Sequence, residues 1–151
     1  MILDGQFQLA APRQEVWDKL NNTQVLKGCI PGCETLEESE ENSFQAIIRA
    51  KVGPISAKFK SVINLRDIVE PKCYTLNVTS KGGAAGMGEG VAQVALLEKD
   101  GGTQLNYSVE LKVRGKLAQI GSRLINNTII KLSNEFFDKF AAQFKNPDAK
   151  P

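Results

Sequence analysis

Two periodicities meet in the stretch 103–144, which reads TQLNYSVELKVRGKLAQIGSRLINNTIIKLSNEFFDKFAAQF. Up to Arg114 apolar and polar residues alternate, which predicts a β-strand with one buried face. From Lys116 to about Phe144 apolar residues recur every three or four positions, which predicts one long amphipathic helix. At ~1.5 Å per residue this helix would be about 43 Å long, enough to cross a whole sheet. Gly115 separates the two elements.

Alternation also marks most of the chain upstream of this stretch. Gly53-Pro54 and the tripeptide Asp100–Gly102 supply turns, and the regular spacing predicts an antiparallel meander with one apolar face. The expected strands cover residues 2–9, 44–52, 55–66, 74–79, 88–97 and 103–113. Five or six of the strands follow the helical region near the N-terminus.

Two short helices are expected between the first strand and the meander. Pro12 suits the first turn of a helix because its missing N–H would be unpaired there, and apolar residues follow at helical spacing up to Leu20. Thr23 is placed to cap a second helix through Leu26, which Gly28 would stop.

These elements predict a single α+β domain. A sheet with one apolar face must bury it, and the long C-terminal helix is the only element of adequate size. We therefore expect a strongly curved antiparallel sheet that grips one helix. The domain is expected to span residues 1–146, with a frayed tail at 147–151.

The composition excludes several classes of function. The sequence contains no histidine, which removes Ser-His and Cys-His nucleophile pairs and histidine-ligated zinc or haem. A net charge of +2 is too small for electrostatic capture of nucleic acid. Carboxylate, lysine or tyrosine catalysis, a borrowed cofactor, or pure binding remain.

The cysteines and the N-terminal residues predict a cytoplasmic protein. Charges at Asp4 and Arg13 interrupt any apolar core of a secretory signal, and no segment reaches the ~18 apolar residues of a spanning helix. Cys29, Cys33 and Cys73 are expected to be reduced thiols. A structural zinc site uses four ligands, so we expect no metal.

No constellation in the sequence specifies a reaction. The acidic run 34–41 is expected to be a solvated loop, and neither Glu89 nor Glu110 has an evident partner. The glycine-rich segment 82–90 lacks the context of a phosphate loop and predicts a bent, bulged hairpin or a mobile lip. Tyr74 and Tyr107 fall on inward positions, as core residues or as donors to a ligand carbonyl. We therefore assign no catalytic residue and no cofactor.

The interior allows two interpretations. Small residues on inward positions would leave an apolar space between sheet and helix, of the kind that binds small molecules. These residues are Ala46, Ala50, Ala57, Ser61, Ala92 and Thr128. Composition alone favours a filled interior, because native cores are close-packed and aromatic residues are at hand.

Several motifs, taken in order, are similar to those of one known family. They are Ala11-Pro12, Val16-Trp17, Cys29–Glu34 (CIPGCE), Val52–Ala57 (VGPISA), Gly82–Gly86 (GGAAG), Gly102-Thr103 with Tyr107, Gly115–Ile125 (GKLAQIGSRLI) and Phe136-Phe137. The chain resembles, over nearly its whole length, the CoxG family, which takes its name from a subunit of carbon monoxide dehydrogenase. That family belongs to the superfamily of START, Bet v 1-like and polyketide-cyclase (SRPBCC) domains.

The resemblance implies a helix-grip fold with a hydrophobic cavity, which reverses the preference for a filled interior. It implies association with a molybdenum-containing carbon monoxide dehydrogenase or related hydroxylase. Members are thought to recruit that enzyme to the membrane or to carry a quinone-like lipid. Such members often continue into a linker and a hydrophobic tail, whereas this sequence ends at Pro151. We therefore expect transient contact at the inner membrane face, without stable anchoring.

The first hypothesis is a non-enzymatic carrier of a lipid or quinone-like ligand. Its expected ligand contacts are Ile48, Phe59, Leu76, Met87, Tyr107, Ile120 and Leu124. A second is a cyclase-like or hydrolase-like enzyme that uses Glu89 or a tyrosine. A third is a docking protein for the enzyme that has a filled interior and an exposed apolar patch.

Overall fold

The computed structural model describes residues 1–144, so the expected tail at 147–151 lies outside the described residues. Seven strands form one sheet. They are β1 (Ile2–Leu9), β2 (Cys33–Glu40), β3 (Ser43–Val52), β4 (Ile55–Val69), β5 (Cys73–Lys81), β6 (Met87–Lys99) and β7 (Gly102–Arg114). The helices are α1 (Arg13–Leu20), α2 (Thr23–Cys29), the 3-10 turn η1 (Gly83–Ala85), α3 (Lys116–Ile120) and α4 (Ser122–Ala142).

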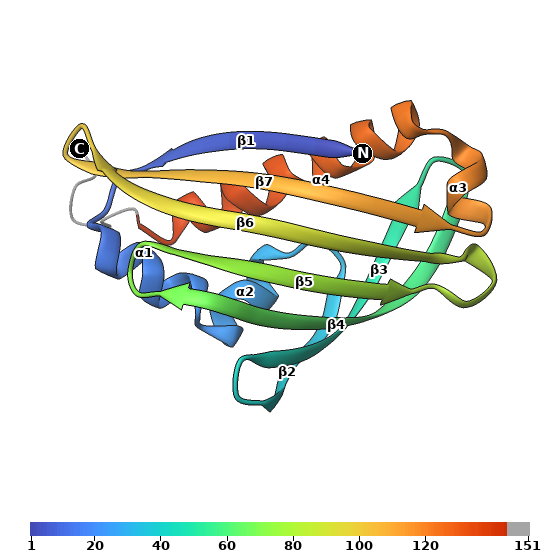
Figure 1. Cartoon of the computed structure of the whole chain (residues 1–151), viewed down its shortest axis with the longest axis horizontal. Coiled ribbons are helices and arrows are strands. Elements are labelled where there is room, and N and C mark those ends of the chain that lie inside the picture. The colour runs from blue at the N-terminus through green and yellow to red at the C-terminus, as the bar shows by residue number, and fades with distance from the viewer. Residues whose placement is uncertain (145–151) are drawn as a thin grey trace.

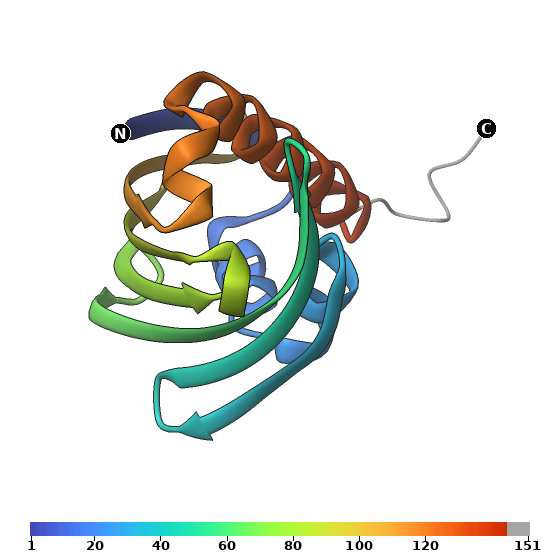
Figure 2. The ribbon, with the colours of Figure 1, turned by 90° about the vertical axis from the view of Figure 1, so that its right-hand side faces the viewer.

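The sheet is antiparallel throughout and has the order β1-β7-β6-β5-β4-β3-β2. It curves around α4, which lies across its concave side (Figures 1 and 2). Residues whose side chains face α4 are here called the inner register, and those on the convex side the outer register. The arrangement confirms the predicted helix-grip fold.

The short helices follow β1 as predicted, with one correction at a cap. Pro12 precedes α1, whose first residue is Arg13. Asn22, and not Thr23, caps α2: its side-chain oxygen accepts hydrogen bonds from the backbone N–H groups of Gln24 and Val25. Asparagine caps a helix at least as well as threonine, so the sequence allowed either residue.

The predicted long C-terminal helix is confirmed as α4, but its predicted start at Lys116 is wrong. The chain forms α3, breaks at Gly121 and resumes as α4. Gly121 has φ 97° and ψ 148°, a conformation that only glycine adopts readily. The apolar spacing continues across this glycine, which is why periodicity alone missed the break. α4 with its 21 residues is about 32 Å long.

The acidic run at 34–41 forms most of an edge strand, β2, where a loop was expected. The glutamates of β2 are exposed, and Leu36 is the buried residue of this strand. Charged side chains on an edge strand discourage pairing with another chain. The run therefore has a structural role that its composition concealed.

The glycine-rich segment forms a compact turn between β5 and β6. Gly83–Ala85 make the single 3-10 turn η1, and the N–H of Gly82 donates to the carbonyl of Gly86 at 2.8 Å. A β-carbon at Gly82 would lie 2.6 Å from the ring of Phe59. The turn therefore packs directly against β4.

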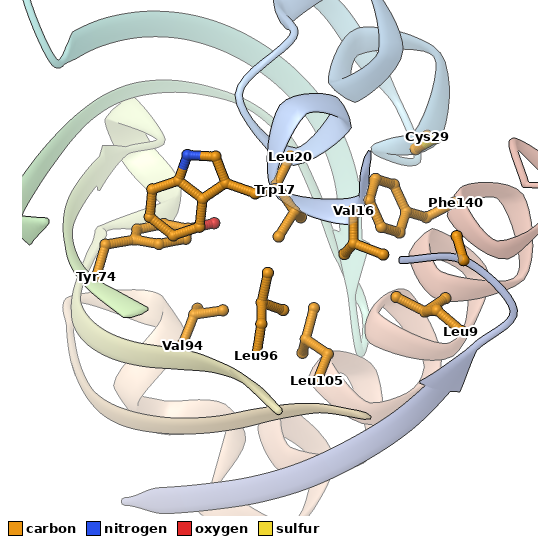
Figure 3. Close-up of a cluster of buried hydrophobic side chains, with 11 residues drawn as sticks. Leu9, Val16, Trp17, Leu20, Cys29, Tyr74, Val94, Leu96, Leu105 and Phe140 are labelled. Atoms are coloured by element: carbon orange, nitrogen blue, oxygen red, sulfur yellow. The ribbon is translucent and has the colours of Figure 1, made fainter. Parts of the chain in front are cut away.

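A close-packed core fills the end of the molecule where α1 and α2 cover the sheet. Its side chains come from β1, α1, α2, β5, β6, β7 and α4 (Figure 3). Trp17 meets Tyr74 edge-on, with ring centroids 5.4 Å apart. The fully buried Thr103 donates a hydrogen bond from Oγ1 to the carbonyl of Ala11 at 2.8 Å. This end of the interior is filled, as composition alone predicts.

Candidate functional site

Two apolar cavities lie between the inner register and α4. The larger, about 260 Å³, adjoins the packed core and is lined by Leu76, Ala92 and Val109 of the sheet and Phe137 of α4, among others; we call it the core lobe. The smaller, about 220 Å³, lies toward the other end of the sheet. It is lined by inner-register residues that include Val78, Gly90 and Leu111, with Thr128 and Ile129 of α4, and we call it the glycine lobe.

The two lobes are adjacent along β4, β5, β6 and β7. On β5 the lining changes from Leu76 to Val78, which are consecutive inner-register positions. Ala92 pairs with Leu76 and Val109, and all three line the core lobe. The next inward row, in which Gly90 pairs with Val78 and Leu111, lines the glycine lobe. The lobes therefore lie end to end under α4.

The lining of both lobes is almost wholly apolar. Among the described residues, no aspartate, glutamate, lysine or arginine lines either lobe. The polar side chains in the glycine lobe are the hydroxyls of Ser61, Ser80 and Thr128. Apolar walls with a few placed polar groups are typical of sites for small molecules.

Four of the seven residues predicted to contact a ligand line this site. Ile48 and Phe59 pair across β3 and β4 and line the glycine lobe. Leu76 and Tyr107 line the core lobe. The structure thus brings these four side chains to the two adjoining lobes, and their contact with a ligand stays a prediction.

The other three predicted residues lie outside the lining of both lobes. Met87 is on the outer register of β6, opposite Lys81 and Arg114, because the alternation that turns Ala92 inward turns Met87 outward. Ile120 of α3 and Leu124 of α4 lie beside the β3–β4 turn, where a β-carbon at Gly53 would be 3.3 Å and 3.8 Å from them. The side chain of Leu124 is 46% exposed.

The sequence interpretation missed several lining residues, and some carried a usable signal. Gly88 and Gly90 share the inward parity of Ala92, so extending that alternation would have placed them in the lining. Ser80 could have been found in the same way from Tyr74 and Leu76 on β5. Leu117 of α3 also carried a signal, because it belongs to the apolar residues that recur every three or four positions after Lys116.

Of the titratable candidates, Tyr74 and Tyr107 line the core lobe, whereas the acidic ones lie outside both lobes. Glu89 is on the outer register opposite Lys112. Hydrogen bonds and ion pairs with Lys58 and Arg49 lower the pKa of the exposed Glu34. Burial raises the pKa of the Tyr74 hydroxyl well above its usual range, so this phenol stays protonated.

The cysteines and the helices give two further observations for residues 1–144. Cys29, Cys33 and Cys73 are free, and burial raises the pKa of Cys29 and Cys33. Over these residues no group of three or more potential metal ligands is found. No helix in this part of the chain combines the length and apolar character needed to cross a bilayer.

We compared the sequence and the fold with those of known proteins. The model of the CoxG family, described as a subunit of carbon monoxide dehydrogenase, matches residues 5–145. A conserved protein from Geobacillus kaustophilus has a similar crystal structure, with a TM-score of 0.89 and 30% identity over 95% of this chain and 94% of that one. A search of curated proteins found no match.

More distant structures share the fold alone. The crystal structure of Ara h 8.0201 has a TM-score of 0.72 at 13% identity, covering 95% of this chain and 96% of that one. The Zhui aromatase/cyclase from Streptomyces sp. R1128 has a TM-score of 0.70 at 13% identity, covering 95% and 92%. These chains are similar in architecture to the one described here.

Proposed function

Because this chain belongs to the CoxG family of carbon monoxide dehydrogenase subunits, we propose that it is a non-enzymatic carrier of a hydrophobic small molecule held between the sheet and α4. The observation that carries this proposal is the pair of adjoining apolar lobes, about 260 Å³ and about 220 Å³. Each is smaller than a typical ligand pocket, but together they lie in the usual range of ~300–1,000 Å³.

The small residues on the sheet explain why this space stays open. Protein interiors are normally close-packed, so a persistent cavity requires side chains too short to meet across it. Ser61, Ser80, Gly88 and Gly90 occupy neighbouring inner-register positions of the glycine lobe. Larger residues at these positions would fill the lobe, so their size supports a binding role.

The chemistry of the lining supports binding over catalysis. General acid–base or nucleophilic catalysis needs a titratable group at the reacting atom. Of the groups that the enzyme alternative would use, Glu89 is on the outer register. Tyr74 and Tyr107 line the core lobe, and burial raises the pKa of the Tyr74 hydroxyl, which disfavours its phenolate. A docking protein without a ligand would have a filled interior, and the two lobes count against that alternative.

Contact with an anionic membrane surface is the second part of the proposal. Lys60 and Lys81 lie directly opposite each other on the outer register of β4 and β5, and such like-charged pairs usually destabilise a sheet. Neither belongs to the ion pairs found among the described residues, whereas Arg49 and Lys58 share Glu34. Lys60 and Lys81 are therefore available for an external anion.

This cationic pair lies at the end of the sheet that holds the glycine lobe. Further exposed cations are Lys51 near the end of β3, Arg114 at the end of β7 and Arg123 in the first turn of α4. The exposed Leu124 adds an apolar side chain there. Basic residues next to apolar ones favour an anionic lipid surface, and a hydrophobic ligand would leave or enter a bilayer at such a contact.

The partner enzyme follows from the family description alone. We propose that the loaded protein serves a carbon monoxide dehydrogenase or related molybdenum hydroxylase, and that the ligand is a lipid or quinone-like molecule. Co-purification of such an enzyme with the tagged protein tests the partner separately from the ligand. If no such enzyme co-purifies, the proposed partner is contradicted and the proposed carrier function is not affected.

The carrier function is tested by loading the protein from a cell lipid extract. The repurified protein is examined by native mass spectrometry, and a bound lipid or quinone is expected. Ala92→Phe, at the boundary between the lobes, should abolish the adduct while the fold is retained. Failure of the unaltered protein to acquire any lipid from extracts or from pure quinone would contradict the proposal.

Ala46→Phe is the matched control for this experiment. Ala46 is 2% exposed and lines neither lobe. A phenylalanine there should overpack the core, at a cost of ~1–3 kcal/mol in unfolding free energy. Ala92→Phe should cost less, because its ring enters open space. Equal costs for both variants would mean that the lobes do not exist in solution.

A further inference from the structure

Two serine hydroxyls meet inside the glycine lobe. Ser61 of β4 and Ser80 of β5 are directly paired across the strands, and their Oγ atoms are 2.6 Å apart. Ser61 is 3% exposed, and both side chains line the lobe. The pair is the main polar feature on the sheet side of an otherwise apolar wall.

One of the two hydroxyl protons of this serine pair takes no part in the hydrogen bond between them. Two hydroxyls carry two protons, and a single proton lies between the two oxygens. Neither hydroxyl donates to any other group among residues 1–144. The second O–H is therefore available to a molecule in the lobe, and a buried donor without an acceptor is costly.

The α4 side of the glycine lobe offers a hydrogen-bond acceptor. Thr128 lines the same lobe from α4, and its Oγ1 donates to the carbonyl of Leu124 at 2.9 Å. Its proton is thus used within the helix, and the oxygen can only accept a further hydrogen bond. The lobe combines one free donor on the sheet with one acceptor on the helix, and it has no charged side chain.

We propose that Ser61 and Ser80 bind the polar head of the ligand, and that this head is a neutral oxygen, a carbonyl or a hydroxyl. The inference rests on the proposed carrier function and adds the class of ligand to it. A carboxylate or an ammonium group would be buried here without a partner of opposite charge, which is strongly unfavourable. The apolar remainder of the ligand extends along the row of Leu76 and Ala92 into the core lobe.

The expected selectivity is modest and measurable. A hydrogen bond to a neutral acceptor contributes about 0.5–1.5 kcal/mol, which corresponds to a preference of about two- to tenfold. Nonan-2-one and n-decane have the same number of heavy atoms and differ chiefly in the oxygen. We expect the protein to retain the ketone about two- to tenfold more tightly, beyond the difference in their solubility in water, and to bind nonanoate weakly.

The test compares these three probes on the full chain and on Ser61→Ala/Ser80→Ala. Retention of the volatile probes is measured by depletion of the vapour phase, and nonanoate by calorimetry. The double variant removes donor and acceptor together, so it should fold normally. It should lose the preference for the ketone and keep its affinity for n-decane. In the unaltered protein the C=O stretching band of the bound ketone should move to lower frequency.

Ser108→Ala is the matched control, because Ser108 lies on the outer register of β7 and lines neither lobe. It should leave both the preference and the C=O band unchanged. Loss of the preference in Ser108→Ala, or equal ketone binding and an unshifted band in all proteins, would overturn the assignment to Ser61 and Ser80. If the unaltered protein retains neither the ketone nor n-decane, the carrier function itself fails, which is a distinct result.

Discussion

The ring of Tyr107 on β7 lies directly over Gly5 on β1. The two residues are paired across the strands, and a β-carbon at Gly5 would overlap the ring. The ring also stacks on Phe137 of α4, with centroids 5.9 Å apart and planes at 14°. Because Tyr107 lines the core lobe, the absence of a side chain at Gly5 determines where one wall of the lobe stands.

Gly5→Ala should therefore push the ring of Tyr107 from its place against Phe137. We expect a loss of ~1–3 kcal/mol in unfolding free energy, the usual cost of overpacking. The displaced ring should also narrow the core lobe and lower lipid uptake. Urea denaturation measures the first effect and native mass spectrometry the second.

Gly28→Ala provides the control for that substitution. Gly28 lies in α2, and no atom lies within 4 Å of a β-carbon built there. Alanine should raise the unfolding free energy by ~0.5–1 kcal/mol through its better helix propensity. If Gly5→Ala were as stable as Gly28→Ala, the contact between Gly5 and Tyr107 would not exist in solution.

The meander from β3 to β7 could be predicted because the signal is local, whereas the pairing of β1 with β7 joins the two ends of the sheet and was not predicted. Alternation and turn residues such as Gly53-Pro54 determine each hairpin, and consecutive hairpins determine the meander. The extent of β2 and the break at Gly121 were missed, since glutamates are unusual in strands and the apolar spacing runs unbroken through the glycine.

The site was harder to predict because a cavity is a property of packing across elements. The alternation along each strand identified Ile48, Phe59, Leu76 and Tyr107 as inward-facing. No pattern in the sequence gives the distance between the sheet and the helix that face each other across a cavity. Met87 shows the limit of such reasoning. Its apolar side chain favoured an inward position, whereas the alternation of β6 points it outward.

Stability should fall at alkaline pH because of Tyr74. Burial raises the pKa of its hydroxyl in the folded protein above the value of ~10 in the unfolded chain. The unfolded state therefore releases a proton that the folded state keeps, so the contribution is complete below about pH 10 and decreases above it. Denaturation curves between pH 8 and 11 should show this decline.

Tyr74→Phe tests the assignment of that decline. Phenylalanine keeps the edge-on contact with Trp17 and removes the ionisable group. Unfolding free energy in the variant should depend less on pH above about pH 10. A decline as steep as that of the unaltered protein would attribute the effect to other groups.

Lys60→Ala/Lys81→Ala should separate membrane contact from stability. Each lysine near an anionic membrane contributes about 1 kcal/mol, so the double variant should bind vesicles that contain phosphatidylglycerol about 30-fold more weakly. Its unfolding free energy should stay the same or rise, because two like charges that face each other are removed.

Vesicle sedimentation at two salt concentrations measures the binding, and phosphatidylcholine vesicles serve as the control membrane. Binding of the unaltered protein should weaken with added salt, since the attraction between exposed charges is largely screened beyond ~10 Å at 0.1 M. Equal binding to both kinds of vesicle, or no loss in the double variant, would contradict a cationic contact at this end of the sheet.

Thr103 should contribute to stability because its hydrogen bond joins the segment just before α1 to β7. The residue is fully buried and donates to the carbonyl of Ala11 at 2.8 Å. Thr103→Val has nearly the same shape but no donor, so the carbonyl would be left unpaired at a cost of ~1–3 kcal/mol. Thr103→Ser keeps the donor and loses one methyl group, at a cost of about 1 kcal/mol. Urea denaturation of both variants should find the valine variant less stable. If the serine variant proves the weaker of the two, packing of the methyl group, and not the hydrogen bond, holds the helix against the sheet.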